Sequence, residues 1–301
     1  MAGVEQMLRI AALRPAAHRL SIMRVTTYAL VGYALFSGYF AATGFAASRP
    51  DQIRIEYVAP TDPQHRRLYE LLQQRRVLER FQQFLAFIRL PQPLLLTTAG
   101  CDGQSSAWYE PSTHAVTMCY EFLADLDRNA PRETTPAGVT PQDAITGRVV
   151  EVFLHEIAHG LLDLLKIPVL GREEDAADQV AAYVLVSLGE QHARSTVVGA
   201  AYMYHYDAQR LELKPEHFAD VHSFEAQRFY NVLCIAYGSN PKLFADVIDK
   251  DYLPQDRAEG CEGEFKQVRY AIRTLFRPYI DLKLARKAGA FDWIAQPTHS
   301  R

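Results

Sequence analysis

Two histidines and a glutamate lie close together in a segment that is otherwise apolar. The segment reads His155-Glu156-Ile-Ala-His159, with Val, Phe and Leu residues before it and Leu residues after it. Histidines four residues apart project from one face of a helix, so both imidazoles can reach a single cation at about 2.0 to 2.1 Å. Glu156 points to the side of that face, where its carboxylate can take a proton from a metal-bound water. The pattern therefore predicts a catalytic Zn2+ site.

A third protein ligand is expected in the acidic segment 173–178. Glu174 and Asp178 share one helical face there. If Glu174 binds the metal, Asp178 can accept the second ring proton of His155 and so fix the tautomer that leaves the other nitrogen free. Glu173 is the alternative ligand, but the position four residues after it is an alanine. We therefore predict Glu174 as the third ligand and Asp178 as the carboxylate that orients His155.

The H-E-x-x-H pattern has little weight by itself, since in a chain with ten histidines it arises by chance on the order of once or twice in a hundred. The alternative is a core helix with two buried histidines that hydrogen-bond to neighbouring groups. That alternative leaves unexplained both the glutamate between the histidines and the acidic helix just downstream. The context therefore favours the metal site.

The elements that must position these residues follow from hydrophobic periodicity and from turn residues. Alternation and short apolar runs predict strands, and apolar residues at three- and four-residue spacing predict helices. The expected strands are residues 53–58, 94–98, 107–109 and 115–118. The expected helices are residues 65–89, 140–165 and 172–188, followed by a helical region over 195–285. We predict an α+β fold that is helix-rich, with a small mixed sheet and an active-site helix carrying the H-E-x-x-H motif.

Length and composition fit one compact domain of enzyme size. The chain has 301 residues, of which 49% are hydrophobic and 22% are charged, as in ordinary folded proteins. The formal net charge of -3 provides no general field for nucleic acid or anionic lipid. We therefore expect no nucleic-acid partner.

The N-terminal region differs from the rest of the chain. Residues 1–24 include several basic residues, and residues 26–47 are almost all apolar or small. This order is typical of a secretory signal peptide, although the stretch is also long enough for a membrane anchor that is not cleaved. We therefore divide the chain into an N-terminal extension with signal or anchor, 1–47, and a folded domain, 48–290. The protein is expected to be exported, either periplasmic or secreted, or else anchored in the inner membrane.

Four cysteines follow the N-terminal region. An even number of cysteines in an exported chain indicates two disulfides, and three pairings are possible. We favour Cys101 with Cys119 and Cys234 with Cys261, because each pair closes a short loop between predicted elements. If the signal prediction is wrong, four buried free thiols in a cytoplasmic protein become the better interpretation.

The two motifs together resemble those of the gluzincin metallopeptidases, which pair H-E-x-x-H with a downstream E-x-x-x-D. More closely, the chain resembles an uncharacterised bacterial family of metallopeptidases of unknown function. This resemblance covers roughly residues 50 to 280. It is carried by Cys119-Tyr-Glu121 and by the segments 168–179 and 227–238, in addition to the two motifs.

The resemblance implies a zincin-like fold, a Zn2+ cofactor and a peptide or protein substrate. It also implies a residue that stabilises the oxyanion, for which His222 is the candidate because it opens a predicted helix where similar enzymes place such a donor. A histidine at a helix terminus without a role is the alternative, and Arg228 and Tyr230 are weaker candidates. By analogy, substrate is expected to add as a strand along residues 114–118, taken to be a sheet edge.

Two other classes of protein remain open at this point. One is an exported zinc-binding structural or regulatory protein that keeps the three ligands without turnover, which the intact Glu156 argues against. The other is a membrane-tethered interaction module, which requires that residues 26–47 be retained.

Overall fold

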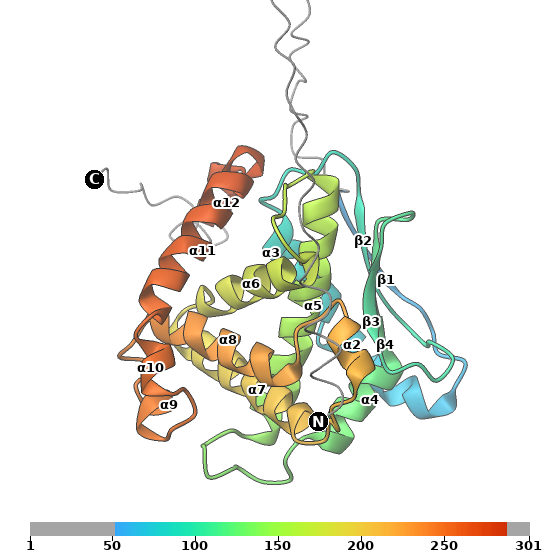
Figure 1. Ribbon diagram of the computed structural model, residues 1–301. Helices are drawn as coiled ribbons and strands as arrows, with labels where there is room; N and C mark the ends of the chain where they lie inside the picture. The colour runs from blue at the N-terminus through green and yellow to red at the C-terminus, as the bar shows by residue number, and fades with distance from the viewer. Residues whose placement is uncertain (1–51, 288–301) are drawn as a thin grey trace, which may run out of the picture. The chain divides into compact units, whose positions relative to one another are not determined.

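The computed structural model describes residues 52–287, which form a helix-rich α+β fold with a small sheet on one side (Figure 1). The strands are β1 (Ile53–Tyr57), β2 (Leu94–Ala99), β3 (Ala107–Glu110) and β4 (Ala115–Cys119). The longer helices are α2 (Arg66–Gln74), α3 (Val77–Leu85), α4 (Tyr120–Asn129), α5 (Pro141–Leu164), α6 (Glu173–Val186), α7 (Glu190–Ala208), α8 (Glu225–Ser239) and α11 (Cys261–Phe276). The short helices are α9 (Asp246–Asp249), α10 (Gln255–Ala258) and α12 (Leu282–Lys287). The predicted fold class, α+β with a small mixed sheet, is confirmed.

The sheet has the strand order β1-β2-β4-β3. The pairs β1–β2 and β2–β4 are parallel, whereas β3 and β4 are antiparallel. The prediction that residues 114–118 form an exposed edge is therefore wrong, because β4 pairs with a strand on each side. The edge beyond β4 is β3. Strand order depends on pairing between distant segments, which alternation within one strand does not encode.

The single helix predicted over residues 65–89 is two helices, α2 and α3. Arg76, which lies between them, has a φ of 53° in the left-handed region. This turn lets α2 contact α4 while α3 contacts β1 and β2. The apolar stripe in the sequence is thus continuous, but it faces two different neighbours and no straight helix could cover both.

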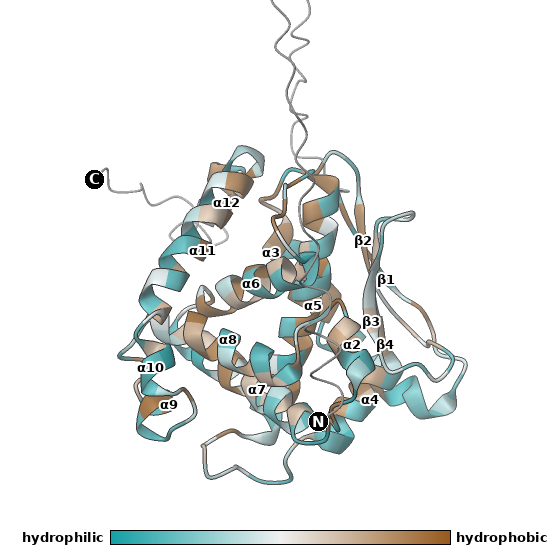
Figure 2. Cartoon of the chain, viewed as in Figure 1, coloured by the Kyte–Doolittle hydropathy of each residue, from teal (hydrophilic) through white to brown (hydrophobic). Residues whose placement is uncertain are grey.

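Helix α5 is the central element, with the sheet on one side and α6, α7 and α8 on the other (Figure 1). It begins with a capping box in which Thr140 and Asp143 satisfy each other's backbone N–H groups. It crosses α7 closely because Gly147 and Gly199 lie at the crossing, where a Cβ on either glycine would overlap the backbone of the other helix. Figure 2 shows apolar residues gathered where these central helices meet. The closely packed centre of the fold therefore carries the H-E-x-x-H motif.

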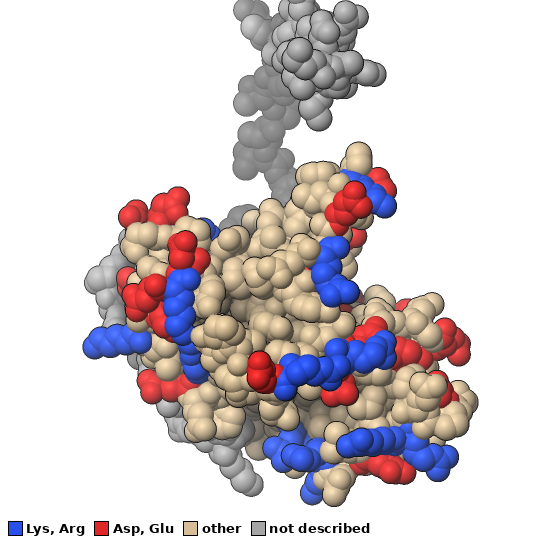
Figure 3. Space-filling model, turned by 90° about the horizontal axis from the view of Figure 1, so that it is seen from below, with Lys and Arg blue, Asp and Glu red and all other residues tan. Residues whose placement is uncertain are grey.

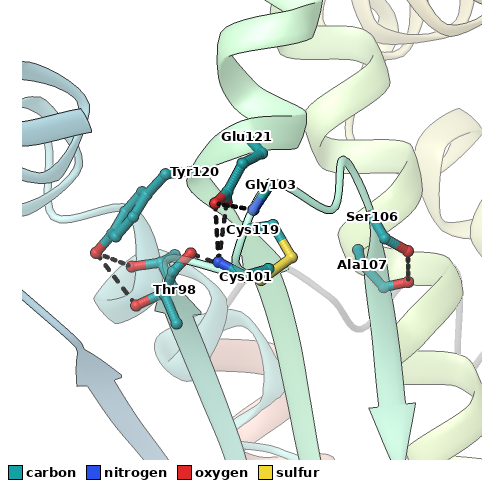
Figure 4. Close-up of a disulfide and its surroundings, with 9 residues drawn as sticks. Thr98, Cys101, Gly103, Ser106, Ala107, Cys119, Tyr120 and Glu121 are labelled. Atoms are coloured by element: carbon teal, nitrogen blue, oxygen red, sulfur yellow. Dashed lines mark hydrogen bonds between the residues drawn. A yellow bond between two sulfur atoms is a disulfide. The ribbon is translucent and has the colours of Figure 1, made fainter. Parts of the chain in front are cut away.

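Two disulfides fix the ends of elements, and they are the pairs favoured from the sequence. Cys101–Cys119 joins the loop after β2 to the end of β4, and the Glu121 carboxylate beside it accepts the N–H groups of Cys101 and Gly103 (Figure 4). Cys234–Cys261 joins α8 to the start of α11. Two disulfides indicate an oxidising, extracytoplasmic compartment.

The proposed signal or anchor, residues 26–47, lies outside the described residues. Between residues 52 and 287, none of the helices combines the length and the apolar character that a membrane crossing requires. On the face shown in Figure 3, basic and acidic side chains are interspersed, in keeping with the small net charge of -3.

Candidate metal centre

Helices α5 and α6 bring His155, His159 and Glu174 together, and we call these three residues the metal cluster. One donor atom from each lies within 4.8 Å of the other two. The Nε2 atoms of His155 and His159 are 3.2 Å apart, and Glu174 Oε2 lies 3.0 Å from the first and 3.2 Å from the second. The side chain of His155 is 5% exposed, that of His159 is 12% and that of Glu174 is 20%, so the cluster is sheltered but open on one side.

The donor set of the metal cluster fits a zinc-like cation. A tetrahedral ion with bonds of about 2.0 to 2.1 Å separates its donor atoms by about 3.3 to 3.4 Å, which is close to the three separations in the metal cluster. Two imidazole nitrogens and one carboxylate oxygen are also the ligand set of known catalytic zinc sites with an open fourth position. The residues present therefore fit a divalent cation without rearrangement of the helices.

Each histidine of the metal cluster has a carboxylate on its other ring nitrogen. His155 Nδ1 lies 2.8 Å from Asp178 Oδ1, as expected from the sequence. His159 Nδ1 lies 2.8 Å from Glu173 Oε1, a contact that the sequence analysis missed. Such partners fix the tautomer in which Nε2 is free to bind a cation. Glu173 and Glu174 are thus both part of the site, but only Glu174 faces both Nε2 atoms.

The electrostatics of the metal cluster favour positive charge. Burial alone would lower the pKa of His155, but its hydrogen bonds to Asp178 and Glu174 outweigh this and raise that pKa to about 9. Burial alone would raise the pKa of the Glu174 carboxyl, yet hydrogen bonds from His155, His159 and His222 hold that pKa far below its usual range. The carboxylates around these imidazoles create a negative potential that a cation would neutralise.

Glu156 occupies the position next to His155 on α5 and is half-buried. Burial raises the pKa of its carboxyl above the usual range, while the charges of His155 and His159 act in the opposite direction. The backbone N–H of Tyr109, on the edge strand β3, also lowers the pKa of this carboxyl. A carboxyl group with a raised pKa beside a cation site is suited to accepting and returning a proton near neutral pH.

His222, the predicted oxyanion donor, lies in the loop before α8 and is brought to the metal cluster. Its Nε2 is 3.0 Å from Glu174 Oε2, and its side chain is 45% exposed. Its Nδ1 lies 3.1 Å from Asp220 Oδ1. The rings of His155 and His222 are stacked, with 6.2 Å between their centroids. His222 therefore contacts the metal cluster at its open side, through Glu174.

Arg228 does not face the site in the way an oxyanion donor would, so that weaker prediction is wrong. Its guanidinium is buried and donates two hydrogen bonds to Asp178, from Nε at 2.8 Å and from Nη2 at 2.6 Å. Tyr230, the other weaker candidate, is 40% exposed and its ring packs on Phe229. Arg228 acts on the metal cluster only through Asp178 and His155.

Arg228 belongs to a set of polar side chains behind the metal cluster, which we call the buried ionic cluster because all of them except the partly exposed Asp178 are buried. Its members are Arg148, Glu151, Asp178, Tyr204 and Arg228. Glu151 accepts hydrogen bonds from Arg148 at 2.8 Å and from Tyr204 at 2.6 Å. The sequence analysis missed this cluster, although one signal was present. Arg148, Glu151, His155 and His159 recur at three- and four-residue spacing, so one face of an otherwise apolar helix is polar along its length.

Comparison with known proteins agrees with this geometry. The model of the DUF4344 family, whose description is "Putative metallopeptidase", matches residues 57–276, which is more than half of the chain. No curated protein and no solved structure matches the chain. The matched region contains both motifs, and a cluster of two histidines and a glutamate in a metallopeptidase family implies a bound metal ion. The chain therefore belongs to the DUF4344 family of putative metallopeptidases.

Proposed function

We propose that the protein is a zinc-dependent peptidase in which His155, His159 and Glu174 hold Zn2+ and Glu156 is the general base. The observation that carries this proposal is the convergence of two Nε2 atoms and one carboxylate oxygen within 4.8 Å, next to a half-buried glutamate. A structural zinc site usually has four protein ligands and no adjacent base, whereas a catalytic site keeps one position for water or substrate. The intact Glu156 therefore favours hydrolysis over a purely structural role.

The proposed mechanism divides the work between the cation and the side chains around it. When bound, the cation supplies a Lewis acid that polarises a peptide carbonyl and lowers the pKa of water to about 7. Glu156 accepts a proton from the attacking water and then returns it to the leaving amine. Asp178 holds the ring of His155 in the orientation that presents Nε2, and Glu173 does the same for His159.

His222 is proposed to donate a hydrogen bond to the oxygen that becomes negatively charged during attack. Its support is its place at the open side of the metal cluster, with Nε2 3.0 Å from Glu174 Oε2. Donation from Nε2 requires the fully protonated ring, which carboxylates at both nitrogens favour, Asp220 at Nδ1 and Glu174 at Nε2. Donors of this kind typically contribute about 10²- to 10³-fold to turnover.

The substrate is proposed to bind as an extended chain along β3 rather than along β4. Strand β3 is the edge strand beyond β4, and the backbone N–H of Tyr109 on this strand favours the ionised form of Glu156. A peptide added to this edge would gain main-chain hydrogen bonds and would pass the general base.

We also propose that the protein is exported to the periplasm or to the medium, with residues 1–47 as signal or anchor.

The test combines metal analysis with chelation. The full chain is purified, its metal content is measured by elemental analysis, and a mixed peptide library is assayed before chelation, after chelation and after Zn2+ is restored. We expect one zinc per chain and cleavage that chelation abolishes and Zn2+ restores. One zinc without cleavage of any peptide would support the alternative, a zinc-binding structural or regulatory protein. Cleavage that survives complete removal of metal would overturn the proposal.

A further inference from the structure

The three histidines at this site share one arrangement. His155, His159 and His222 each direct Nε2 to the same oxygen, Glu174 Oε2, at 3.0, 3.2 and 3.0 Å. Each also has its Nδ1 on a carboxylate of its own, at 2.8 Å from Asp178, 2.8 Å from Glu173 and 3.1 Å from Asp220. A ring held by a carboxylate at one nitrogen is the usual arrangement of a metal-ligating histidine. His222 therefore shares with the two expected ligands both the contact to Glu174 and the carboxylate at Nδ1, although it lies outside the H-E-x-x-H and E-x-x-x-D motifs.

The loop that carries His222 is fixed to the helix that carries Glu174. Ser223 Oγ donates to Asp175 Oδ1 at 2.6 Å, and Arg172 Nη2 donates to Ser223 Oγ at 2.6 Å. The Asp220 carboxylate also accepts the backbone N–H of His222 at 2.8 Å. The backbone of this loop is thus held at the start of α6. The imidazole itself is half-exposed and can rotate without breaking these contacts.

We propose that His222 is a fourth protein ligand of the cation in the resting protein, so that the site is closed until substrate displaces this imidazole. The inference rests on the proposed metal site. It deepens the proposed role of His222, because the same Nε2 cannot bind the cation and donate to a substrate oxygen at once. A site with four protein donors has no position for water and is inactive in hydrolysis. The resting protein is therefore latent, and a bound peptide must move His222 aside.

The distances show which movement is required, because His222 is not in the group of donor atoms that lie within 4.8 Å of one another. The centroids of His155 and His159, which are both expected ligands, are 4.8 Å apart, whereas those of His155 and His222 are 6.2 Å apart. The Nε2 of His222 is already 3.0 Å from Glu174 Oε2, close to the donor separation of about 3.3 Å around a tetrahedral zinc ion. A tilt of the His222 ring toward His155, on the solvent-exposed side, completes the set of four donors.

The test counts the imidazoles on the metal and then replaces one of them. X-ray absorption of the zinc-loaded wild-type protein, free of substrate, should fit three imidazole rings. In the His222→Ala variant the count should fall to two, and Zn2+ affinity measured by competition with a chelator should fall at least about 10-fold. Free imidazole added to the Co2+-loaded variant should restore the visible spectrum of the wild type. The His192→Ala variant, which removes an exposed histidine on α7, is the matched control and should change none of these readouts.

Two results would overturn the inference. One is a count of two imidazoles in the wild-type protein, which needs no variant and so does not depend on how well the variant folds. The other is a His222→Ala protein with wild-type metal affinity and no response to imidazole, which would leave His222 as an oxyanion donor only. A wild-type protein that binds no cation would instead refute the proposed metal site, and the inference would fail with it.

Discussion

The metal cluster and the buried ionic cluster contain similar charged side chains but balance their charges differently. In the buried ionic cluster, the carboxylates of Glu151 and Asp178 face the guanidinium groups of Arg148 and Arg228. In the metal cluster, Glu174 faces three imidazoles and, among residues 52–287, pairs with no arginine or lysine. The charges of the buried ionic cluster are balanced by its own side chains, whereas the metal cluster needs protons or a cation for balance. Asp178 belongs to the buried ionic cluster and also contacts the metal cluster through His155.

The largest expected effect concerns Glu156, which belongs to neither cluster. We expect Glu156→Gln to lower the turnover of a cleaved peptide by about 10²- to 10⁴-fold, because the amide cannot accept a proton. Zinc content should remain that of the wild type, since Glu156 is not a ligand. Peptide cleavage rates and elemental analysis of the same preparation measure both effects. The exposed Glu259, changed to Gln, is the matched control. Full turnover in Glu156→Gln would remove this residue from the mechanism.

The next effect tests the balance of the buried ionic cluster. We expect Arg228→Met to lower the free energy of unfolding by about 3 to 5 kcal/mol, because Asp178, whose side chain is 18% exposed, would lose both hydrogen bonds from the guanidinium and keep only its contact with His155. Urea denaturation of the metal-free protein measures this change. Arg257→Met breaks a half-exposed pair with Glu264 and should cost at most about 1 kcal/mol. An equal loss of unfolding free energy in the two variants would show that Arg228 in the buried ionic cluster contributes no more than an arginine in an ordinary surface ion pair.

The link between the clusters is tested at Asp178. We expect Asp178→Asn to weaken Zn2+ binding by about 10- to 100-fold, because His155 loses the carboxylate that orients its ring. Chelator competition measures the affinity. Glu151 lies within 4.8 Å of His155, but its hydrogen bonds are to Arg148 and Tyr204 and not to the metal cluster. Glu151→Gln should therefore lower stability with a much smaller change in affinity. If Glu151→Gln weakens zinc binding as strongly as Asp178→Asn does, Asp178 is not the specific link between the two clusters.

The smallest effect is local to the start of α5. Thr140→Ala removes the side-chain oxygen that accepts the N–H of Asp143 at 3.1 Å, and should lower the free energy of unfolding by about 1 kcal/mol. Because the metal cluster lies more than three turns along the same helix, zinc affinity should not change. Urea denaturation and chelator competition on one preparation measure both quantities. A drop in affinity would indicate that the position of the whole helix, and not only its stability, depends on this cap.

The parts of the site that lie within one helix could be predicted from the sequence. His155 and His159 are one turn apart, and so are Glu174 and Asp178, so helical geometry alone brings each pair to one face. Contacts between elements could be predicted only in part. The contact of Asp178 with His155 follows once two helices are assumed to pack, but that of Arg228 with Asp178 depends on how α8 crosses α6.

The same distinction holds for the fold. The strands and the central helix follow from local periodicity, and the structure has them within a few residues of the predicted bounds. The break at Arg76 and the edge position of β3 do not follow from local periodicity, because both depend on which distant segments pack together. Arg228 was a weaker candidate for the oxyanion donor, and only the tertiary structure shows that its side chain is buried and bonded to Asp178.

The most direct test of the metal cluster compares two adjacent glutamates. The zinc content of the full chain is measured for the wild type, for Glu174→Ala and for Glu173→Ala, after dialysis against a fixed concentration of a weak chelator. We predict one zinc per chain in the wild type, almost none in Glu174→Ala, and partial or full retention in Glu173→Ala, because only Glu174 faces the Nε2 atoms of His155 and His159. A Glu174→Ala protein that keeps its zinc, or a wild-type protein that binds none, would contradict the account.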